Sequence, residues 1–223
     1  MRSEPPYRDR SVTHVVWDWN GTILDDNHAV VGAVNAVCAA FGRAPIELEY
    51  WRSIFRRPLL DCYQELLRRE LSTADWVEID RRYHDAYRPL LPTTRLAPGI
   101  PDELRRWQAD GGSQSLLSMW FHDELVELVT EYGLTDLFSR IDGLRVDTGG
   151  HGKTDHLIEH LTALRVDPAD VLMIGDVLDD AVAAEAAGTR CVLVTTGMMG
   201  RSALEAGGVP VVDSIAAALA GYA

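Results

Sequence analysis

Oxygen-bearing side chains stand at the ends of three short apolar runs that have the composition of buried strands. They are Asp18, Ser118 and Asp176, and two further carboxylates, Asp179 and Asp180, follow Asp176 within one helical turn. If the runs are parallel strands of one sheet, their carboxyl ends meet at one edge, where such sheets bind ligands. Carboxylates crowded at that edge raise one another's pKa unless a cation neutralises them. We therefore expect a hard divalent ion there, and Mg²⁺ is the usual choice when phosphate also binds.

The basic residues single out one further position. The chain of 223 residues has 21 basic and 34 acidic side chains, a formal net charge of −13, and Lys153 is its single lysine. In a chain that otherwise uses arginine, a lone lysine at a predicted helix start indicates a local requirement for a compact cation. The acidic excess argues against nucleic acid or an anionic membrane as a partner, because both need a basic surface. It is compatible with a small anionic substrate.

Nothing in the sequence suggests export or a membrane span. Residues 1–11 are polar, carry no apolar signal region and are expected to be a disordered lead-in. The longest nearly apolar stretch, residues 29–41, is too short to cross a bilayer. The three cysteines, Cys38, Cys62 and Cys191, are too few and too widely spaced for a disulfide framework. We expect a cytoplasmic protein with reduced thiols.

The elements that must position the candidate residues alternate between strand and helix. Strands are predicted at 12–17, 115–117, within 141–146, and at 171–174, 191–194 and 211–212. Helices are predicted at 101–110, 123–132, 153–164, 181–187 and after residue 212. This alternation predicts an α/β protein whose doubly wound, Rossmann-like parallel sheet is covered by helices on both faces.

A block of about 65 residues, from 26 to 91, interrupts this alternation with helical patterns alone. Val30, Val34, Val37 and Phe41 have helical spacing, and Gly42 is a plausible helix stop. Further helices are predicted over 46–57, through Leu66 and Leu67, and from Ser72, where a capping-box pattern begins. No strand-like run occurs in the block.

The polar residues match four motifs in order. Residues 17–24, Trp-Asp-Trp-Asn-Gly-Thr-Ile-Leu, resemble the first motif of the haloacid dehalogenase superfamily, in which Asp-x-Asp-Gly-Thr follows an apolar strand. Ser118 resembles the second motif, Lys153 the third, and Asp176 with Asp179 and Asp180 the fourth. The helical block lies where phosphoglycolate-phosphatase-like members carry a helical cap. The resemblance thus implies a core made of residues 1–24 and 95–223, with an inserted cap of residues 25–94.

The resemblance implies a Mg²⁺-dependent phosphatase of a small phosphorylated metabolite. Asp18 would be the nucleophile that forms an aspartyl-phosphate, and Lys153 would steady both Asp18 and the transferring group. The implied metal ligands are Asp18, the Asn20 backbone carbonyl, Asp176 and Asp180; Asp179 remains an alternative to Asp180. The implied phosphate-binding residues are Gly21, Thr22, Ser118, Met119, Lys153 and Arg57.

Asn20 departs from the family pattern. The family's phosphatases carry a second Asp at this position, which protonates the leaving oxygen, and losing a general acid typically costs about 10²–10⁴-fold in rate. The loss should be largest for alkoxide leaving groups and small for groups that leave readily as anions. Water or His28 could replace the missing acid.

Other activities fit less well. Phosphonate-cleaving relatives need a cap lysine, which this chain lacks, and dehalogenase relatives need no acidic pair in the fourth motif. A phosphotransferase or mutase, which keeps the aspartyl-phosphate, is a second hypothesis. A phosphate-binding regulatory module with weak turnover is a third, and only Asn20 favours it.

Other residues near the motifs have two interpretations each. Arg56 and Arg57 could bind a second anionic group of the substrate or be solvated charges at a helix end. Trp19 could line the pocket, although packing on the sheet is favoured. We expect a monomer or a homodimer.

Overall fold

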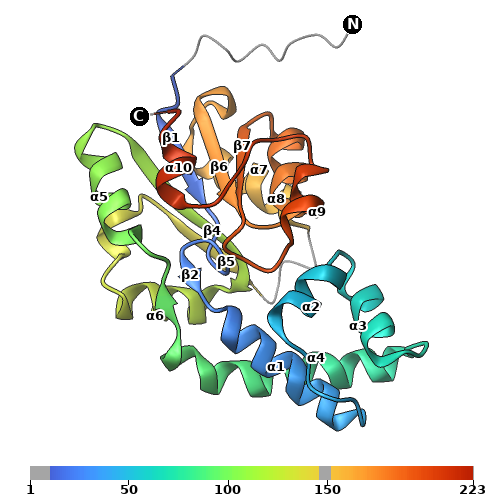
Figure 1. The fold of residues 1–223 in the computed structure, drawn as a ribbon. Coiled ribbons are helices and arrows are strands. Elements are labelled where there is room, and N and C mark those ends of the chain that lie inside the picture. Colours follow the sequence, from blue (N-terminus) through green and yellow to red (C-terminus); the bar gives the residue numbers. More distant parts are fainter. Residues whose placement is uncertain (1–10, 146–151, 223) are drawn as a thin grey trace, which may run out of the picture.

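A six-stranded parallel sheet lies at the centre of the computed structural model, which describes residues 11–145 and 152–222 (Figure 1). Its order is β5-β4-β1-β6-β7-β8. The strands are β1 (His14–Trp17), β4 (Ser113–Phe121), β5 (Ile141–Leu144), β6 (Val171–Gly175), β7 (Arg190–Val194) and β8 (Val211–Val212). Every pairing in this sheet is parallel. The predicted Rossmann-like α/β fold is confirmed, whereas the predicted lead-in lies, but for residue 11, outside the described residues.

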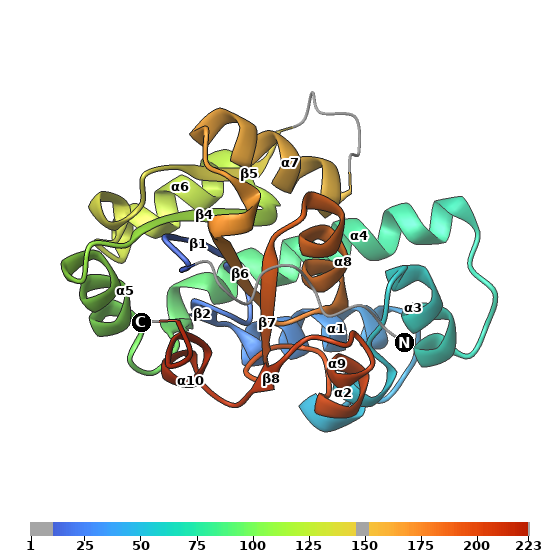
Figure 2. The same cartoon turned by 90° about the horizontal axis from the view of Figure 1, so that it is seen from above.

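Helices cover both faces of the sheet, as Figure 2 shows. One face carries α7 (Lys153–Leu164), α8 (Leu178–Ala187) and the short α9 (Arg201–Glu205). The other carries α5 (Ile100–Ala109), α6 (His122–Glu131) and α10 (Ile215–Leu219). Strand β1 shows why two layers form, because Val15 and Trp17 join one apolar cluster and Val16 joins the other. Successive side chains of a strand point to opposite faces, so a strand buried on both sides needs two helical layers.

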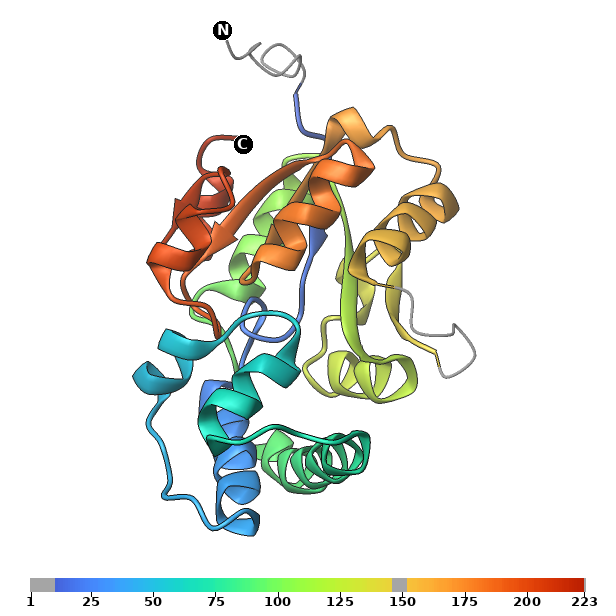
Figure 3. The ribbon, with the colours of Figure 1, turned by 90° about the vertical axis from the view of Figure 1, so that its right-hand side faces the viewer.

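The helical block lies together at one end of the sheet (Figures 1 and 3). It consists of α1 (Asn27–Ala40), α2 (Leu48–Ile54), α3 (Leu59–Leu67) and α4 (Thr73–Tyr87), followed by a 3₁₀ segment over Arg88–Thr93. The chain enters and leaves it through β2 (Leu24–Asp25) and β3 (Arg95–Leu96), a small antiparallel pair that the sequence did not indicate. The two connections therefore lie side by side.

Helix ends in the block follow the local signals in part. The predicted capping box is confirmed, since Ser72 Oγ accepts from Asp75 N and Asp75 Oδ2 accepts from Ser72 N. The predicted helix over 46–57 is wrong at both ends, because α2 spans only Leu48–Ile54. Asn35 exchanges two hydrogen bonds with the backbone of Ile46 and holds it outside the helix. At the other end, the backbone of Phe55 is already extended, and Arg56 N donates to Cys62 Sγ at 3.1 Å instead of continuing the helix.

Strand β4 is longer than the sequence predicts, since the predicted strand ends at Ser118. The strand continues to Phe121, because the apolar residues after Ser118 are also extended and Trp120 is buried. Its pairing with β5 is irregular between Leu117 and Phe121. Ser118 therefore lies inside a strand, at the place where the ladder is interrupted, rather than after its end.

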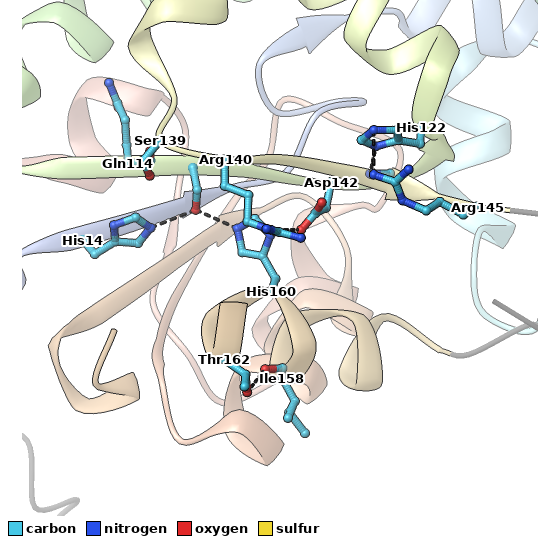
Figure 4. A network of polar contacts seen from close by, with 12 residues as sticks. His14, Gln114, His122, Ser139, Arg140, Asp142, Arg145, Ile158, His160 and Thr162 are labelled. Atoms are coloured by element: carbon cyan, nitrogen blue, oxygen red, sulfur yellow. Dashed lines mark hydrogen bonds and ion pairs between the residues drawn. The ribbon is translucent and has the colours of Figure 1, made fainter. Parts of the chain in front are cut away.

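A buried polar network ties α7 to the sheet (Figure 4). The Ser115 hydroxyl, on β4, lies 2.8 Å from His14 Nε2 and 2.8 Å from His160 Nε2. His160 Nδ1 in turn lies 2.7 Å from the Asp142 carboxylate on β5. Buried polar groups are costly unless each finds a partner, so this chain of contacts fixes where α7 sits on the sheet. Lys153 begins this helix two turns before His160, so the network also positions the lysine.

The burial of His14 in this network predicts that the stability of the protein depends on pH. Burial, and secondly the nearby His160, lower the pKa of His14 to about 4, from an ordinary value of 6.5. As the pH falls, His14 therefore binds a proton in the unfolded chain before it does so in the folded protein. This favours the unfolded state, so stability is lost between pH 6.5 and pH 4. We expect His14 to cost about 2 kcal/mol of unfolding free energy between pH 7.5 and pH 5.

Urea unfolding at both pH values measures this loss, with His14→Gln as the reference that does not titrate. The parent should lose more stability than the variant by about that amount. Equal losses in the two proteins would contradict the lowered pKa of His14.

Candidate active site

Three buried carboxylates meet at the carboxyl ends of the two central strands. Asp18 follows β1, and its backbone N–H donates to the Ile174 carbonyl of β6 at 2.9 Å. Asp176 follows β6, and Asp180 lies in the first turn of α8. One carboxylate oxygen from each of the three lies within 4.8 Å of the others. The neighbouring parallel strands thus bring together carboxylates that are more than 150 residues apart in sequence.

Lys153 lies among these carboxylates. It is the first residue of α7, and its Nζ forms ion pairs with Asp18 Oδ1 and Asp180 Oδ1. The same face of α7 buries His156, Leu157, His160 and Leu161. The 3.6-residue period therefore directs the lysine and the anchoring side chains to one side of the helix. The single lysine of the chain is buried in the site rather than solvated.

The crowding of charge appears in the pKa values. Burial, together with repulsion from Asp180, raises the pKa of Asp18 to about 6, although Lys153 opposes the shift. Burial first, and then repulsion from Asp18 and Asp180, raise the pKa of Asp176 well above its usual range. Burial opposes ionisation of Lys153, but its two carboxylate partners outweigh it and raise its pKa. A divalent cation among these oxygens would stabilise their ionised forms.

Glycines allow the backbone to approach Asp176. A Cβ at Gly197, in the loop after β7, would lie 1.7 Å from Asp176 Oδ2, and one at Gly21 would lie 2.5 Å from the same atom. The next residue along, Met198, donates its backbone N–H to Asp176 Oδ2 at 2.9 Å. Gly21 also has φ +72°, which favours glycine. The loop at 197–198 is thus built closely around one carboxylate of the site.

Asn20 has partners that its position in the motif did not predict. Its Nδ2 donates to Asp26 Oδ2 at 2.9 Å and to the Tyr87 hydroxyl at 2.9 Å. Tyr87 Oη in turn donates to Asp26 Oδ2 at 2.5 Å. Asp26 stands before the first residue of α1, yet its side chain makes no capping hydrogen bond there and instead accepts from Gly21 N. Burial raises the pKa of Asp26, whereas these three donors lower it.

A cavity of about 330 Å³ opens beside this cluster, between the sheet edge and the helical block. Most of the predicted site residues line it: Asp18, Asn20, Gly21, Arg57, Ser118, Met119, Lys153 and Asp176. Asp180 lies behind them, fully buried, with Oδ2 accepting from Val177 N. The sheet edge and the block together therefore gather residues from all four motifs.

Other candidates lie elsewhere. Thr22, predicted to bind phosphate, is fully buried and does not line the cavity. His28 is exposed and lies 2.8 Å from the Thr93 hydroxyl, so it is not placed to replace the missing acid. Arg56 pairs with Glu65 at 2.8 Å, outside the cavity lining. Trp19 is fully buried and packs against Tyr132, which confirms the packing interpretation.

The structure also distinguishes the two acids of the fourth motif. Asp180 is 0% exposed and belongs to the carboxylate cluster. The Asp179 side chain is 39% exposed and lies 3.5 Å from Arg57 Nε in the cavity lining. The geometry therefore favours Asp180, and not Asp179, beside Asp18 and Asp176.

Comparisons with known proteins identify the family of this chain. Residues 12–188 match the family model of haloacid dehalogenase-like hydrolases. Phosphoglycolate phosphatase 1 of Pseudomonas aeruginosa is 28% identical over 96% of this chain and 80% of its own length. Phosphoglycolate phosphatase of Synechococcus elongatus is 29% identical over 86% of this chain and 88% of its own.

Solved structures share the fold. A predicted phosphatase from Clostridium acetobutylicum superimposes with a TM-score of 0.79 at 19% identity, covering 93% of this chain and 95% of its own. A haloacid dehalogenase-like hydrolase from Streptococcus pneumoniae gives 0.80 at 17% identity, covering 95% of this chain and 98% of its own.

The chain belongs to the haloacid dehalogenase-like hydrolase family. Within it, this protein is an enzyme of the phosphatase type. Its three clustered carboxylates are hard oxygen donors, and this donor set fits a divalent cation. Among the described residues, no helix has the length and apolar character needed to cross a membrane.

The approach of the loop at Gly197 to Asp176 can be tested by adding one methyl group. Gly197→Ala places a Cβ where Asp176 Oδ2 now lies, so the carboxylate must move. We expect kcat/KM to fall by about 10²-fold, because misplacing a catalytic group by about 1 Å has this cost. Gly200→Ala in the same loop is the control, since its Cβ would meet its nearest atom at 3.6 Å. Equal activity of the two variants would contradict the role of this approach.

Proposed function

We propose that this enzyme is a Mg²⁺-dependent phosphatase that acts through an aspartyl-phosphate on Asp18. The observation that carries the proposal is the buried cluster of Asp18, Asp176, Asp180 and Lys153 beside an open cavity. A nucleophilic carboxylate must approach an anionic phosphate, and the repulsion between them demands positive charge nearby. The cluster supplies one positive charge, that of Lys153, and carboxylate ligands for a metal cation.

The residues would divide the work as follows. A carboxylate oxygen of Asp18 attacks phosphorus, and the bond from phosphorus to the leaving oxygen breaks with its electron pair going to that oxygen. Water then attacks phosphorus, the bond to Asp18 breaks, and phosphate departs with the carboxylate restored. Lys153 holds Asp18 in place and offsets charge on the phosphoryl oxygens. Ser118, Met119, Gly21 and Arg57, which line the cavity, are proposed to face the phosphate.

The carboxylates of Asp18, Asp176 and Asp180, with the Asn20 carbonyl, are the proposed Mg²⁺ ligands. When bound, the ion would screen the repulsion between nucleophile and substrate. Magnesium is favoured over softer ions because every proposed ligand atom is an oxygen.

Asn20 restricts which leaving groups the proposed reaction can expel efficiently. An amide cannot give a proton to the departing oxygen, so we propose that this enzyme favours substrates whose leaving group departs as a stable anion. The contacts of Asn20 support this view, because both partners of its Nδ2, Asp26 and Tyr87, hold the side chain as a hydrogen-bond donor.

The wider setting of the enzyme is proposed from the same observations. The helices α1–α4 would act as the cap over a core of residues 1–24 and 95–223, since they provide much of the cavity wall. The curated relatives are phosphoglycolate phosphatases, and a small phosphorylated metabolite is proposed here as the substrate. The three cysteines are free and buried, which suits a reducing cytoplasm. A monomer or a homodimer is proposed.

Two alternatives make different predictions. A phosphotransferase or mutase would pass the phosphoryl group to an acceptor rather than to water. A regulatory module with weak turnover would bind phosphate and hydrolyse no ester at a useful rate. Asn20 is the feature that favours this last alternative, whereas the buried Asp18–Lys153 pair opposes it.

The test measures Mg²⁺-dependent hydrolysis of acetyl phosphate, p-nitrophenyl phosphate and ethyl phosphate. The parent should favour the first two, whose leaving groups depart readily. Asp18→Asn should lose activity on all three by at least about 10³-fold, as expected for a missing nucleophile. Activity that survives this change would overturn the mechanism, and no hydrolysis by the parent would favour the binding module.

Restoring an acid at position 20 tests the leaving-group limit. Asn20→Asp alone would set two carboxylates against each other, because Asp26 Oδ2 lies 2.9 Å from the Asn20 amide nitrogen. The double variant Asn20→Asp/Asp26→Asn avoids this repulsion and keeps a donor opposite the new acid. We expect it to gain about 10²-fold on ethyl phosphate and little on acetyl phosphate. Asp26→Asn alone is the matched control. An equal change in activity on ethyl phosphate and acetyl phosphate would contradict the proposed leaving-group preference.

A further inference from the structure

We propose that the substrate of this enzyme is a phosphate monoester with an apolar, aromatic body that carries no second anionic group. The inference rests on the proposed phosphatase function and specifies what the cap side of the cavity accepts. It departs from phosphoglycolate, the substrate for which the curated relatives are named, whose body is a single carboxylate-bearing carbon.

Aromatic rings form much of the cavity wall away from the carboxylate cluster. One group comes from α2, α3 and α4, where Tyr63 lies 5.6 Å from Trp51 and 6.0 Å from Trp76 between ring centroids. All three rings line the cavity, and Trp51 and Tyr63 are buried. Rings at these separations and tilts attract one another and hold their orientations. The wall is therefore an ordered apolar surface.

A second aromatic group lies nearer the nucleophile. Tyr83 and Tyr87 of α4 stack at 5.6 Å with their planes 11° apart, and Tyr87 meets Trp120 of β4 edge-on at 5.1 Å. Val30, Leu59 and Ile79 add aliphatic surface to the same lining. The part of a ligand that enters this region would exchange contact with water for contact with rings and methyl groups. This exchange favours an apolar and preferably flat group.

Charge in the cavity argues against a second anion. The two lysine and arginine side chains that line the described cavity already face carboxylates, since Lys153 pairs with Asp18 and Arg57 Nε lies 3.5 Å from Asp179. The lining acids outnumber these cations. A carboxylate on the substrate body would have to compete with Asp18 or Asp179 for these cations, or remain unpaired in an apolar setting, which is costly.

Size sets the last limit. The cavity of about 330 Å³ must hold the phosphate as well as the body. Sites for drug-sized ligands span roughly 300–1,000 Å³, and this cavity is at the small end. It suits one ring beside the phosphate rather than a nucleotide or a long chain.

The experiment compares ligands that differ only in the ring. Ethyl and 2-phenylethyl phosphate have similar alkoxide leaving groups, so a difference in kcat/KM reports on the body. We expect the phenylethyl ester to be favoured by about 10- to 100-fold, the value of burying a ring. Dissociation constants of ethylphosphonate, 2-phenylethylphosphonate and phosphonoacetate, which cannot be hydrolysed in this way, are measured with Mg²⁺ by tryptophan fluorescence. The phenylethyl compound should bind most tightly by a similar factor.

The outcomes separate the two proposals. Equal binding of ethyl- and phenylethylphosphonate, or tighter binding of phosphonoacetate, overturns the aromatic-body inference even if esters are hydrolysed. Failure to hydrolyse any ester, p-nitrophenyl phosphate included, overturns the proposed function and the substrate assignment with it, whatever the phosphonates do.

A variant tests the wall itself. Trp76→Ala removes a partly exposed ring from the lining, and we expect KM for 2-phenylethyl phosphate to rise about tenfold, with a smaller change for ethyl phosphate. Tyr50→Ala is the matched control, because Tyr50 is 43% exposed and lies outside this cavity. Equal losses on both esters in Trp76→Ala would overturn the contact between this wall and the ring.

Discussion

The structure depends on keeping three carboxylates and one ammonium group together out of water. If all are ionised, Asp18, Asp176, Asp180 and Lys153 carry a net charge of −2, since three negative charges meet one positive charge. Such a cluster is unfavourable by itself, and the raised pKa values of Asp18 and Asp176 express that cost. A divalent cation bound among these oxygens would balance this charge. Without one, the four groups leave an excess of negative charge in a buried site.

The surrounding fold holds this unfavourable arrangement in place. The ends of β1 and β6 place two of the carboxylates, and the first turn of α8 places the third. The network through Ser115 and His160 fixes α7 on the sheet, and with it the position of Lys153. The loop at Gly197 closes around Asp176 with no room for a side chain. Stability elsewhere in the molecule therefore offsets the strain of bringing like charges together.

The sequence predicts what depends on local signals. The parallel sheet follows from apolar runs and their alternation with helices, and Asp18 and Asp176 are prominent because each follows an apolar run. Lys153 is prominent because it is the single lysine of the chain and stands at a predicted helix start. The contacts of Asn20 could not be predicted in this way, because Asp26 resembles an ordinary helix cap and Tyr87 lies 61 residues further along. Gly197 gave no signal either, since a glycine in a loop is common and its closeness to Asp176 is a tertiary fact. The sequence does not reveal the full extent of β4, because Ser118 has the character of a strand end although apolar residues continue the strand beyond it.

Two independent features of the cavity point to the same chemistry. Asn20 cannot protonate a leaving oxygen, which favours groups that depart as stable anions. The rings of α2, α3, α4 and β4 favour a flat apolar body with no charge of its own. An aryl phosphate meets both conditions, because its body is the ring and it departs as a phenolate, whose conjugate acid has a pKa of about 10. An alkyl phosphate with a carboxylate meets neither, since its alkoxide needs a proton and its carboxylate needs a cation that this wall does not leave unpaired. The absence of a general acid at position 20 and the aromatic wall of the cavity therefore favour the same class of substrate.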